Sequence, residues 1–271
     1  MRFAQSFLAA TVLASCASAA SAQAAQGADE DVRYLLGTAV AVSPEYDGAS
    51  RHKARLRPTW AVKFGRIRIA AGGGSALLGF GRTSAGDGAS TQLVESDRWR
   101  LGLSLRVDSG RDSGDAGTTR GLPDVKRTLR ARLYASYALT TDWNLGASLS
   151  QDVLGRKGGL VGSVDLGWRF YRSESTEWTT GIGVSAGNAQ NLRSYFGVPA
   201  SAVAASGKPA YEPGAGLRDV SIGVGFKHTF DKHWFVFGSV GASRLLGPAA
   251  DSPLVQRATN EAAAVGVAWR N

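Results

Sequence analysis

Cysteine and histidine are scarce in this chain of 271 residues, and their scarcity excludes several kinds of site. Cys16 is the single cysteine, so the chain cannot form an internal disulfide. The three histidines are His52, His228 and His233, and none has the spacing to another histidine or to cysteine that a zinc or iron site requires. The sequence therefore predicts no metal site and no cofactor.

The motifs of common enzymes are also missing. The chain has no Gly-x-Ser-x-Gly segment that could form a nucleophile elbow. Gly72-Gly73-Gly74 is no phosphate loop, because neither a Lys-Ser/Thr pair nor a helical pattern follows it. Asp231-Lys232-His233 has the composition of a turn. We predict that the protein is not an enzyme, with an envelope hydrolase as a remote alternative.

Acidic residues are fewer than basic ones, at 22 against 31, which gives a formal net charge of +9. A basic chain can bind nucleic acid, but an exported protein does not routinely meet it. The polyanions available outside the cytoplasm are lipopolysaccharide phosphates and acidic groups of the cell wall. If the export signal and strand pattern described below hold, we therefore expect outer-membrane lipid and lipopolysaccharide as surroundings, and no nucleic-acid partner.

The first 22 residues have the composition of a signal peptide. Arg2 supplies the positive charge, Phe7–Leu13 a short apolar core, and Ala20-Ser21-Ala22 a cleavage site. The segment Leu13–Cys16 resembles a lipoprotein processing box, so lipidation of Cys16 is the alternative. The sequence predicts cleavage near Ala22, a short periplasmic segment over residues 23–32 and one folded unit over 33–271, which the alternation described next predicts to be a barrel.

No apolar run is long enough to cross a bilayer as a helix. Stretches of about ten residues instead alternate between apolar and polar side chains. In residues 98–108, Leu101, Leu103 and Leu105 face one way, whereas Ser104 and Arg106 face the other. Repeated along an exported chain, this pattern predicts an all-β fold, a single antiparallel transmembrane β-barrel.

Twelve strands are expected, with ten as the alternative count, because an even number is usual for bacterial barrels. The predicted strands cover residues 33–43, 54–64, 66–72, 75–81, 98–108, 127–139, 142–151, 159–171, 176–186, 217–230, 232–244 and 260–270. Short gaps then alternate with long ones, as expected for short periplasmic turns and long outer loops. The gap over 82–97 is the exception, being long where a short turn is expected.

Aromatic residues gather near the predicted periplasmic ends of these strands. They are Tyr34, Phe64, Trp99, Trp143, Trp168, Phe170, Trp178, Phe230, Trp234 and Trp269. Rings with an apolar body and a polar edge favour the headgroup level of a membrane. The pattern predicts an aromatic belt at that interface.

Arginines dominate the face that the same alternation turns inward. Arg100, Arg106, Arg130 and Arg132 are candidates for a basic lumen. Such a lumen attracts anions, unless the arginines pair with carboxylates of loops that plug the barrel. Both interpretations remain open at this point.

Three loop segments resemble motifs of the MipA/OmpV family of outer-membrane proteins. The first is Ser43-Pro44-Glu45-Tyr46-Asp47-Gly48, which is similar to the family's Pro-x-Tyr-x-Gly loop. The second is Tyr195-Phe196-Gly197-Val198, similar to its aromatic-aromatic-Gly-Val element. The third and most specific joins Arg244-Leu245 to Asp251-Ser252-Pro253. As residues, these motifs fit loop architecture, since Asp251-Ser252-Pro253 can stiffen a loop by a side-chain turn before a proline.

The resemblance implies a monomeric outer-membrane barrel without enzymatic activity. It also implies, as possible partners, a lytic murein transglycosylase and a murein synthase. The sequence thus predicts a scaffold or binding protein of the cell envelope, linked to murein synthesis and degradation. A channel with anion preference is the main alternative, because of the basic inner face.

Overall fold

A closed antiparallel β-barrel forms the core of the computed structural model, which describes residues 32–73, 87–114 and 116–271. Its strands are β1 Arg33–Pro44, β2 His52–Phe64, β3 Ile67–Ala71, β4 Gly88–Glu95, β5 Trp99–Asp108, β6 Thr128–Ala138, β7 Trp143–Asp152, β8 Leu160–Arg172, β9 Thr176–Gly187, β10 Gly216–Thr229, β11 Trp234–Leu245 and β12 Thr259–Arg270. Each strand pairs with its neighbours in sequence, and β1 closes the barrel against β12. The predicted all-β barrel of twelve strands is confirmed.

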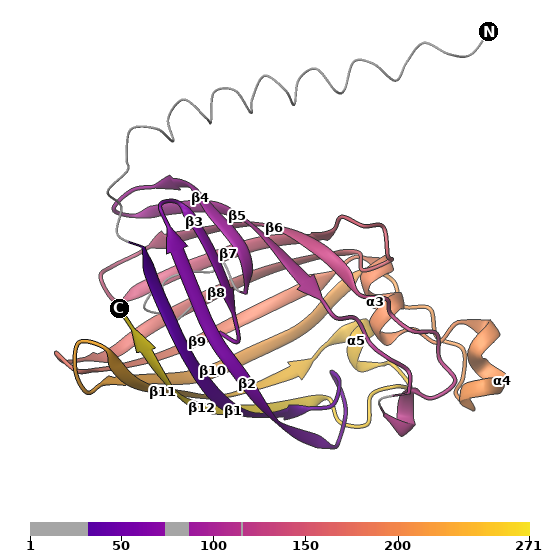
Figure 1. Ribbon diagram of the computed structural model, residues 1–271. Coiled ribbons are helices and arrows are strands. Elements are labelled where there is room, and N and C mark those ends of the chain that lie inside the picture. Colours follow the sequence, from indigo (N-terminus) through magenta and orange to yellow (C-terminus); the bar gives the residue numbers. More distant parts are fainter. Residues whose placement is uncertain (1–31, 74–86, 115) are drawn as a thin grey trace, which may run out of the picture. The chain divides into compact units, whose positions relative to one another are not determined.

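The loops between strands are short at one end of the barrel and long at the other. The tight-turn end has the connections 65–66, 96–98, 139–142, 173–175 and 230–233. The long-loop end carries the helical segments η1 Gly117–Thr119, α3 Ala189–Phe196, η2 Ala200–Ala202, α4 Val203–Ser206 and α5 Gly247–Ala250. Figure 1 shows α3 and α5 at the end of the barrel away from the C-terminus. None of the helices among the described residues is long and apolar enough to cross a membrane.

Side chains alternate between the two faces of the barrel wall as the sequence predicts. Leu103 of β5 pairs with Leu133 of β6, and both are 43% exposed on the outer face. Val40 of β1 pairs in the same way with Val265 of β12. Exposed aliphatic side chains on neighbouring strands form an apolar outer surface of the kind that faces lipid.

The expected aromatic belt lies at the tight-turn end. Trp143 of β7 stacks on Trp168 of β8, with ring centroids 5.2 Å apart and an interplanar angle of 5°. The row continues through Phe170 and Trp178. At the barrel closure, Trp269 of β12 packs against Tyr34 of β1. This arrangement matches the interfacial girdles of membrane barrels.

The fourth strand is the main difference between the prediction and the structure. The predicted strand over 75–81 lies outside the described residues, and β4 instead occupies Gly88–Glu95. The expected long connection over 82–97 is therefore wrong: residues 96–98 form a tight turn in which Ser96 N–H donates to Trp99 O at 2.8 Å. A register shift between Gln92 and Val94 breaks the alternation of β4. Because a bulge reverses the inward and outward phase, the usual strand signal is lost there.

The other eleven strands begin and end within two residues of the predicted positions. Because the barrel is closed, the strands surround a single opening at the long-loop end. The loops at this opening contain most of the family-like motifs.

Candidate functional site

The long-loop end is covered by a loop cap, which we define as segments 45–51, 109–114, 116–127, 188–215 and 246–258. Two apolar clusters lie at its centre. The first contains Leu122, Val198, Ala202 and Leu254, and the second contains Leu192, Phe196, Leu245 and Ala249. All eight residues are at most 6% exposed. Such burial stabilises the packing of three loops, β5–β6, β9–β10 and β11–β12, against one another.

Hydrogen bonds of α3 join the cap to a strand several places away in the barrel. Tyr195 on α3 donates its phenolic hydrogen to Asp108 Oδ2 at the end of β5, at 2.8 Å. Arg111 Nη1 then donates to the Tyr195 carbonyl at 2.8 Å. The β9–β10 connection thus contacts β5, which stands four places from β9 in the closed order of twelve strands. The cap spans the opening rather than lining its rim.

Burial shifts the pKa values of the residues that form these hydrogen bonds. Desolvation raises the pKa of Tyr195, and the neighbouring Asp108 carboxylate raises it further. Desolvation lowers the pKa of Arg111, against the opposing effect of the tyrosines Tyr46 and Tyr195. A neutral phenol therefore donates to an ionised carboxylate, which is a charge-assisted hydrogen bond.

The Pro44-to-Gly48 motif fastens the β1–β2 loop to the cap. Pro44 is the last residue of β1. Tyr46 Oη donates to the Leu254 carbonyl at 3.1 Å, and Gly48 N–H donates to Asn260 Oδ1 at 2.9 Å. Gly48 has φ +97°, and an added Cβ would lie 2.9 Å from Val255 Cγ2. Glycine is required here for both its backbone conformation and its small size.

The second and third motifs meet each other. Ser252 Oγ donates to the Phe196 carbonyl at 2.5 Å and accepts from Leu254 N–H at 3.1 Å. The Pro253 carbonyl accepts from Lys208 Nζ at 3.1 Å. Gly197 ends α3, where its N–H donates to Arg193 O. The side-chain turn expected for Asp251-Ser252-Pro253 is therefore made by Ser252.

Two motif residues lie outside this packing. Asp251 is exposed and follows the last residue of α5. Its backbone N–H donates to the carbonyl of Gly247, the first residue of that helix. Arg244 is exposed on the outer face of β11, one residue before the buried Leu245. The remaining motif residues hold the cap together, a convergence that sequence reasoning did not find because the motifs lie in different loops.

Below the cap lies a cavity of ≈ 1180 Å³, which we call the chamber. Residues 97–98 and 139–142 of the tight turns line it, so it reaches the tight-turn end. Its basic lining residues are Arg57, Arg98, Arg100, Arg132 and Arg169, and its acidic ones are Asp97, Asp142, Asp165 and Glu177. Among the described residues, some of these arginines form ion pairs with acidic side chains, and others do not.

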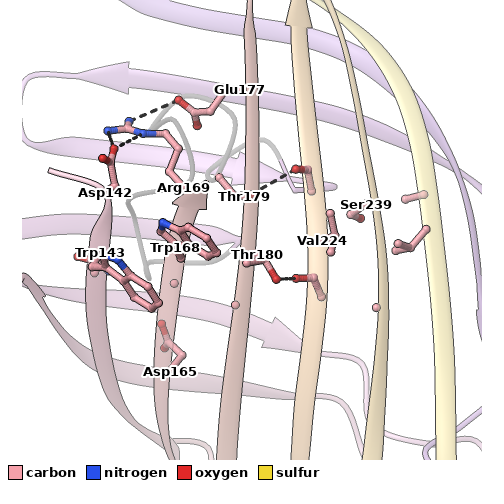
Figure 2. Close-up of a pocket in the computed structure, with 18 of the residues that line it drawn as sticks. Asp142, Trp143, Asp165, Trp168, Arg169, Glu177, Thr179, Thr180, Val224 and Ser239 are labelled. Atoms are coloured by element: carbon pink, nitrogen blue, oxygen red, sulfur yellow. Dashed lines mark hydrogen bonds and ion pairs between the residues drawn. The ribbon is translucent and has the colours of Figure 1, made fainter. Parts of the chain in front are cut away.

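Arg169 is the fully paired member. Figure 2 shows it between Asp142 and Glu177, with Nη2–Oδ1 at 2.9 Å and Nη1–Oε2 at 3.5 Å. Arg100 lies 3.7 Å from Glu95. The guanidinium groups of Arg57 and Arg132 make no hydrogen bond or ion pair in the part of the chain that is described.

Small residues, together with Val224 and Val240, form the wall of the chamber on β9 to β12. The small residues are Gly181, Gly223, Gly225, Ser239, Gly241, Ala262 and Ala264. Thr179 and Thr180 of β9 donate to carbonyls of β10, as the dashed lines in Figure 2 show. Because these side chains are short, the part of the chamber next to this wall is left unfilled by them.

The four arginines proposed for the lumen do not share one environment. Arg100 and Arg132 line the chamber. Arg106 is exposed on the inner face of β5 but is not among the lining residues. Arg130 is only 5% exposed; it lies 3.6 Å from Asp108 and donates to the carbonyls of Gly158 and Gly159. The structure places Arg130 in the support of the cap and away from the chamber.

No group of three or more metal-binding side chains occurs among the described residues. His228 and His233 bond to Thr176 and to the Arg270 carbonyl near the tight-turn end. The site thus consists of the capped opening and the chamber behind it.

A closed antiparallel barrel with an apolar outer face and an aromatic belt defines an outer-membrane β-barrel protein. The family model "MltA-interacting protein MipA" matches residues 36–271, and the chain belongs to this family. It is 30% identical over 162 residues to the MltA-interacting protein of Escherichia coli (strain K12) and, equally, to that of Shigella flexneri. The match spans 59% of this chain and 63% of each relative, which is less than two thirds of their length.

Solved barrels show a looser similarity. A KdgM porin is 11% identical, with a TM-score of 0.40, over 87% of this chain and 98% of that chain. An anion-selective porin from Comamonas acidovorans is 12% identical, with a TM-score of 0.39, over 89% of this chain and 99% of that chain.

Proposed function

We propose that this protein is a non-enzymatic scaffold of the outer membrane that binds murein-processing enzymes at its periplasmic end. The observation that carries the proposal is the loop cap. A barrel closed at its long-loop end by buried apolar clusters offers no straight path for solutes, but its tight-turn end remains available to periplasmic proteins.

Orientation supports this choice of partner. Bacterial outer-membrane barrels place short turns in the periplasm and long loops outside. The signal peptide over residues 1–22, with cleavage near Ala22, provides the export route. In this orientation the barrel is a monomer surrounded by lipid and lipopolysaccharide, and the tight turns face the murein layer.

The relatives supply the class of partner. Two of them carry the name MltA-interacting protein, and MltA is the lytic murein transglycosylase that the resemblance implies. We extend that interaction to this chain, with a murein synthase as a second partner of the same scaffold.

Capture of a purified lytic murein transglycosylase by the detergent-solubilised barrel tests the proposal. The exposed residues Arg172, at the end of β8, and Lys232, in the β10–β11 turn, both lie at the tight-turn end. Replacing both by Glu is expected to weaken capture at least tenfold, because the charge of the docking surface is reversed. The same replacement at Arg120 and Arg156, which are exposed on the long-loop end, is the matched control and should leave capture unchanged. Absence of capture, or equal loss in both variants, would contradict the proposal.

An anion-preferring channel is the second candidate, favoured by the basic lining of the chamber. It requires a path through the loop cap, so bilayer recordings separate the two functions. A hydrolase screen on the purified protein tests the remaining enzymatic alternative, and we expect no activity above background.

A further inference from the structure

We propose that the chamber is a binding site for a small solute that carries two or more carboxylates and enters from the tight-turn end. This inference goes beyond the scaffold function and does not depend on it, because it concerns a ligand inside the barrel rather than a protein on its turns.

The first argument is that two arginines of the chamber lack a partner among the described residues. Arg57 on β2 and Arg132 on β6 both line the chamber, and neither has a hydrogen bond or ion pair within the described chain. The charged groups near Arg132 are Arg106 and Asp165, and neither forms an ion pair with it within the described chain. The nearby Arg169 shows the alternative, since two carboxylates hold it. Arg57 and Arg132 are therefore cationic groups available to a ligand.

The second argument is the shape of the space. Apart from Glu177, the described lining of β9 to β12 consists of glycine, alanine, serine, threonine and valine, so the chamber is walled there by small and medium-sized residues. Pockets for small organic ligands typically enclose about 300–1,000 Å³. The chamber, at ≈ 1180 Å³, can hold a ligand of two to four sugar or amino-acid units together with water.

The third argument is the chemistry of recognition. A guanidinium presents two parallel N–H donors that match a carboxylate, and it keeps its charge at any ordinary pH. Arg57 and Arg132 stand on strands separated by β3, β4 and β5 in the barrel order. One carboxylate cannot satisfy two such separate groups, so a ligand with at least two carboxylates fits best. The Ser239 hydroxyl adds a neutral hydrogen-bonding group on the other wall.

Access follows from the loop cap. Its buried clusters close the long-loop end, whereas tight-turn residues 97–98 and 139–142 line the chamber. A ligand from the periplasmic side therefore reaches the arginines without opening the cap.

Isothermal titration of the full barrel in neutral detergent tests the inference with matched probes. Acetyl-triglutamate amide and its neutral isostere acetyl-triglutamine amide form the peptide pair. A hyaluronan tetrasaccharide and neutral chitotetraose form the sugar pair. We expect at least one acidic probe to bind, both neutral probes to bind at least tenfold more weakly, and the affinity to fall as salt rises, because salt screens charge pairs. The member that binds tells whether the carboxylates come from a peptide or a sugar.

Variants assign the site. Arg57→Gln and Arg132→Gln should each weaken the acidic probe about tenfold. Arg55→Gln is the matched control, because Arg55 is on the same inner face of β2, bonds to Ser43 and does not line the chamber. Heat-dependent gel mobility confirms that each variant is a closed barrel.

Equal binding of acidic and neutral probes, no binding of either acidic probe, or unchanged affinity in both chamber variants would overturn the inference. A barrel that captures no transglycosylase but binds the acidic probe would contradict the scaffold function and leave this inference standing.

Discussion

Tyr195 and Asp108 meet at 2.8 Å although 87 residues separate them in the chain. Tyr195 lies on α3 in the β9–β10 loop, and Asp108 is the last residue of β5. Asp108 also lies 3.6 Å from Arg130, which in turn donates to the carbonyls of the β7–β8 loop. This chain of contacts ties the loop cap to the barrel wall.

Removing the phenolic hydroxyl should loosen the cap. Tyr195→Phe is expected to destabilise the folded barrel by ~1.5–3 kcal/mol, the usual range for a hydrogen bond to a charged group. Tyr46→Phe is the comparison, because the Tyr46 hydroxyl donates to a neutral carbonyl and should cost only ~0.5–1.5 kcal/mol. Urea unfolding in lipid vesicles measures both. Equal effects would show that the charge of Asp108 adds nothing to the bond.

The same tyrosine should make the cap sensitive to alkali. Burial and Asp108 raise the pKa of Tyr195 above its ordinary value of 10.0, so the folded barrel holds the phenolic proton more tightly than the unfolded chain does. The stabilisation is therefore complete below pH 10 and is lost as the pH rises through the raised pKa. The difference in absorbance at ~295 nm between wild type and Tyr195→Phe isolates this ionisation. A transition at or below the ordinary value would contradict the buried, charge-assisted geometry.

Gly48 should tolerate no side chain. Gly48→Ala combines an unfavourable φ of +97° with a Cβ contact of 2.9 Å to Val255. Gly73→Ala is a matched control, since Gly73 has φ +89° and its added Cβ would meet no described atom within 4 Å. We expect Gly48→Ala to cost ~1–3 kcal/mol more in unfolding free energy than Gly73→Ala, because overpacking adds to backbone strain. Similar costs would show that the loop yields to the extra methyl group.

Neighbouring residues of β11 test the two faces of the wall. Val240 is 59% exposed on the outer face, whereas Ser239 is its neighbour on β11, and alternation turns the Ser239 side chain to the opposite face. Val240→Arg should cost ~2–4 kcal/mol if it lies near the bilayer midplane, and Ser239→Arg much less. If only the Ser239 variant lost its heat-dependent gel mobility, and so no longer formed a closed barrel, the assignment of Val240 to the outer face and Ser239 to the inner face would be wrong. The pair Leu103 and Ser104 suits this test less well, because Ser104 is inward but only 3% exposed beside Arg132, where an arginine would not fit.

The sequence predicts the barrel well because each strand carries its own period of two. The alternation in β5 is enough to place Leu103 outside and Ser104 inside without knowledge of any partner. β4 fails the same test because its bulge between Gln92 and Val94 places successive apolar residues out of phase. Local periodicity is thus informative only where the ladder is regular.

The loop cap could not be predicted from such periods. Phe196 and Ser252 belong to different hairpins, and nothing in either segment specifies the other. The likeness to family motifs identified the residues, but only the fold brings their loops together. Arg130 shows the same limit, since its inward phase was predicted and its burial by the β7–β8 loop was not.

The central claim is that the loop cap closes the barrel, and single-channel recording in planar bilayers tests it most directly. The wild-type protein is expected to give no steady conductance under a salt gradient. Deletion of residues 189–210 from the β9–β10 loop removes α3 and should open stepwise, anion-preferring currents, because the basic chamber then connects both sides. Steady conductance of the wild-type barrel, whatever its ion selectivity, would contradict the closed cap and favour the channel.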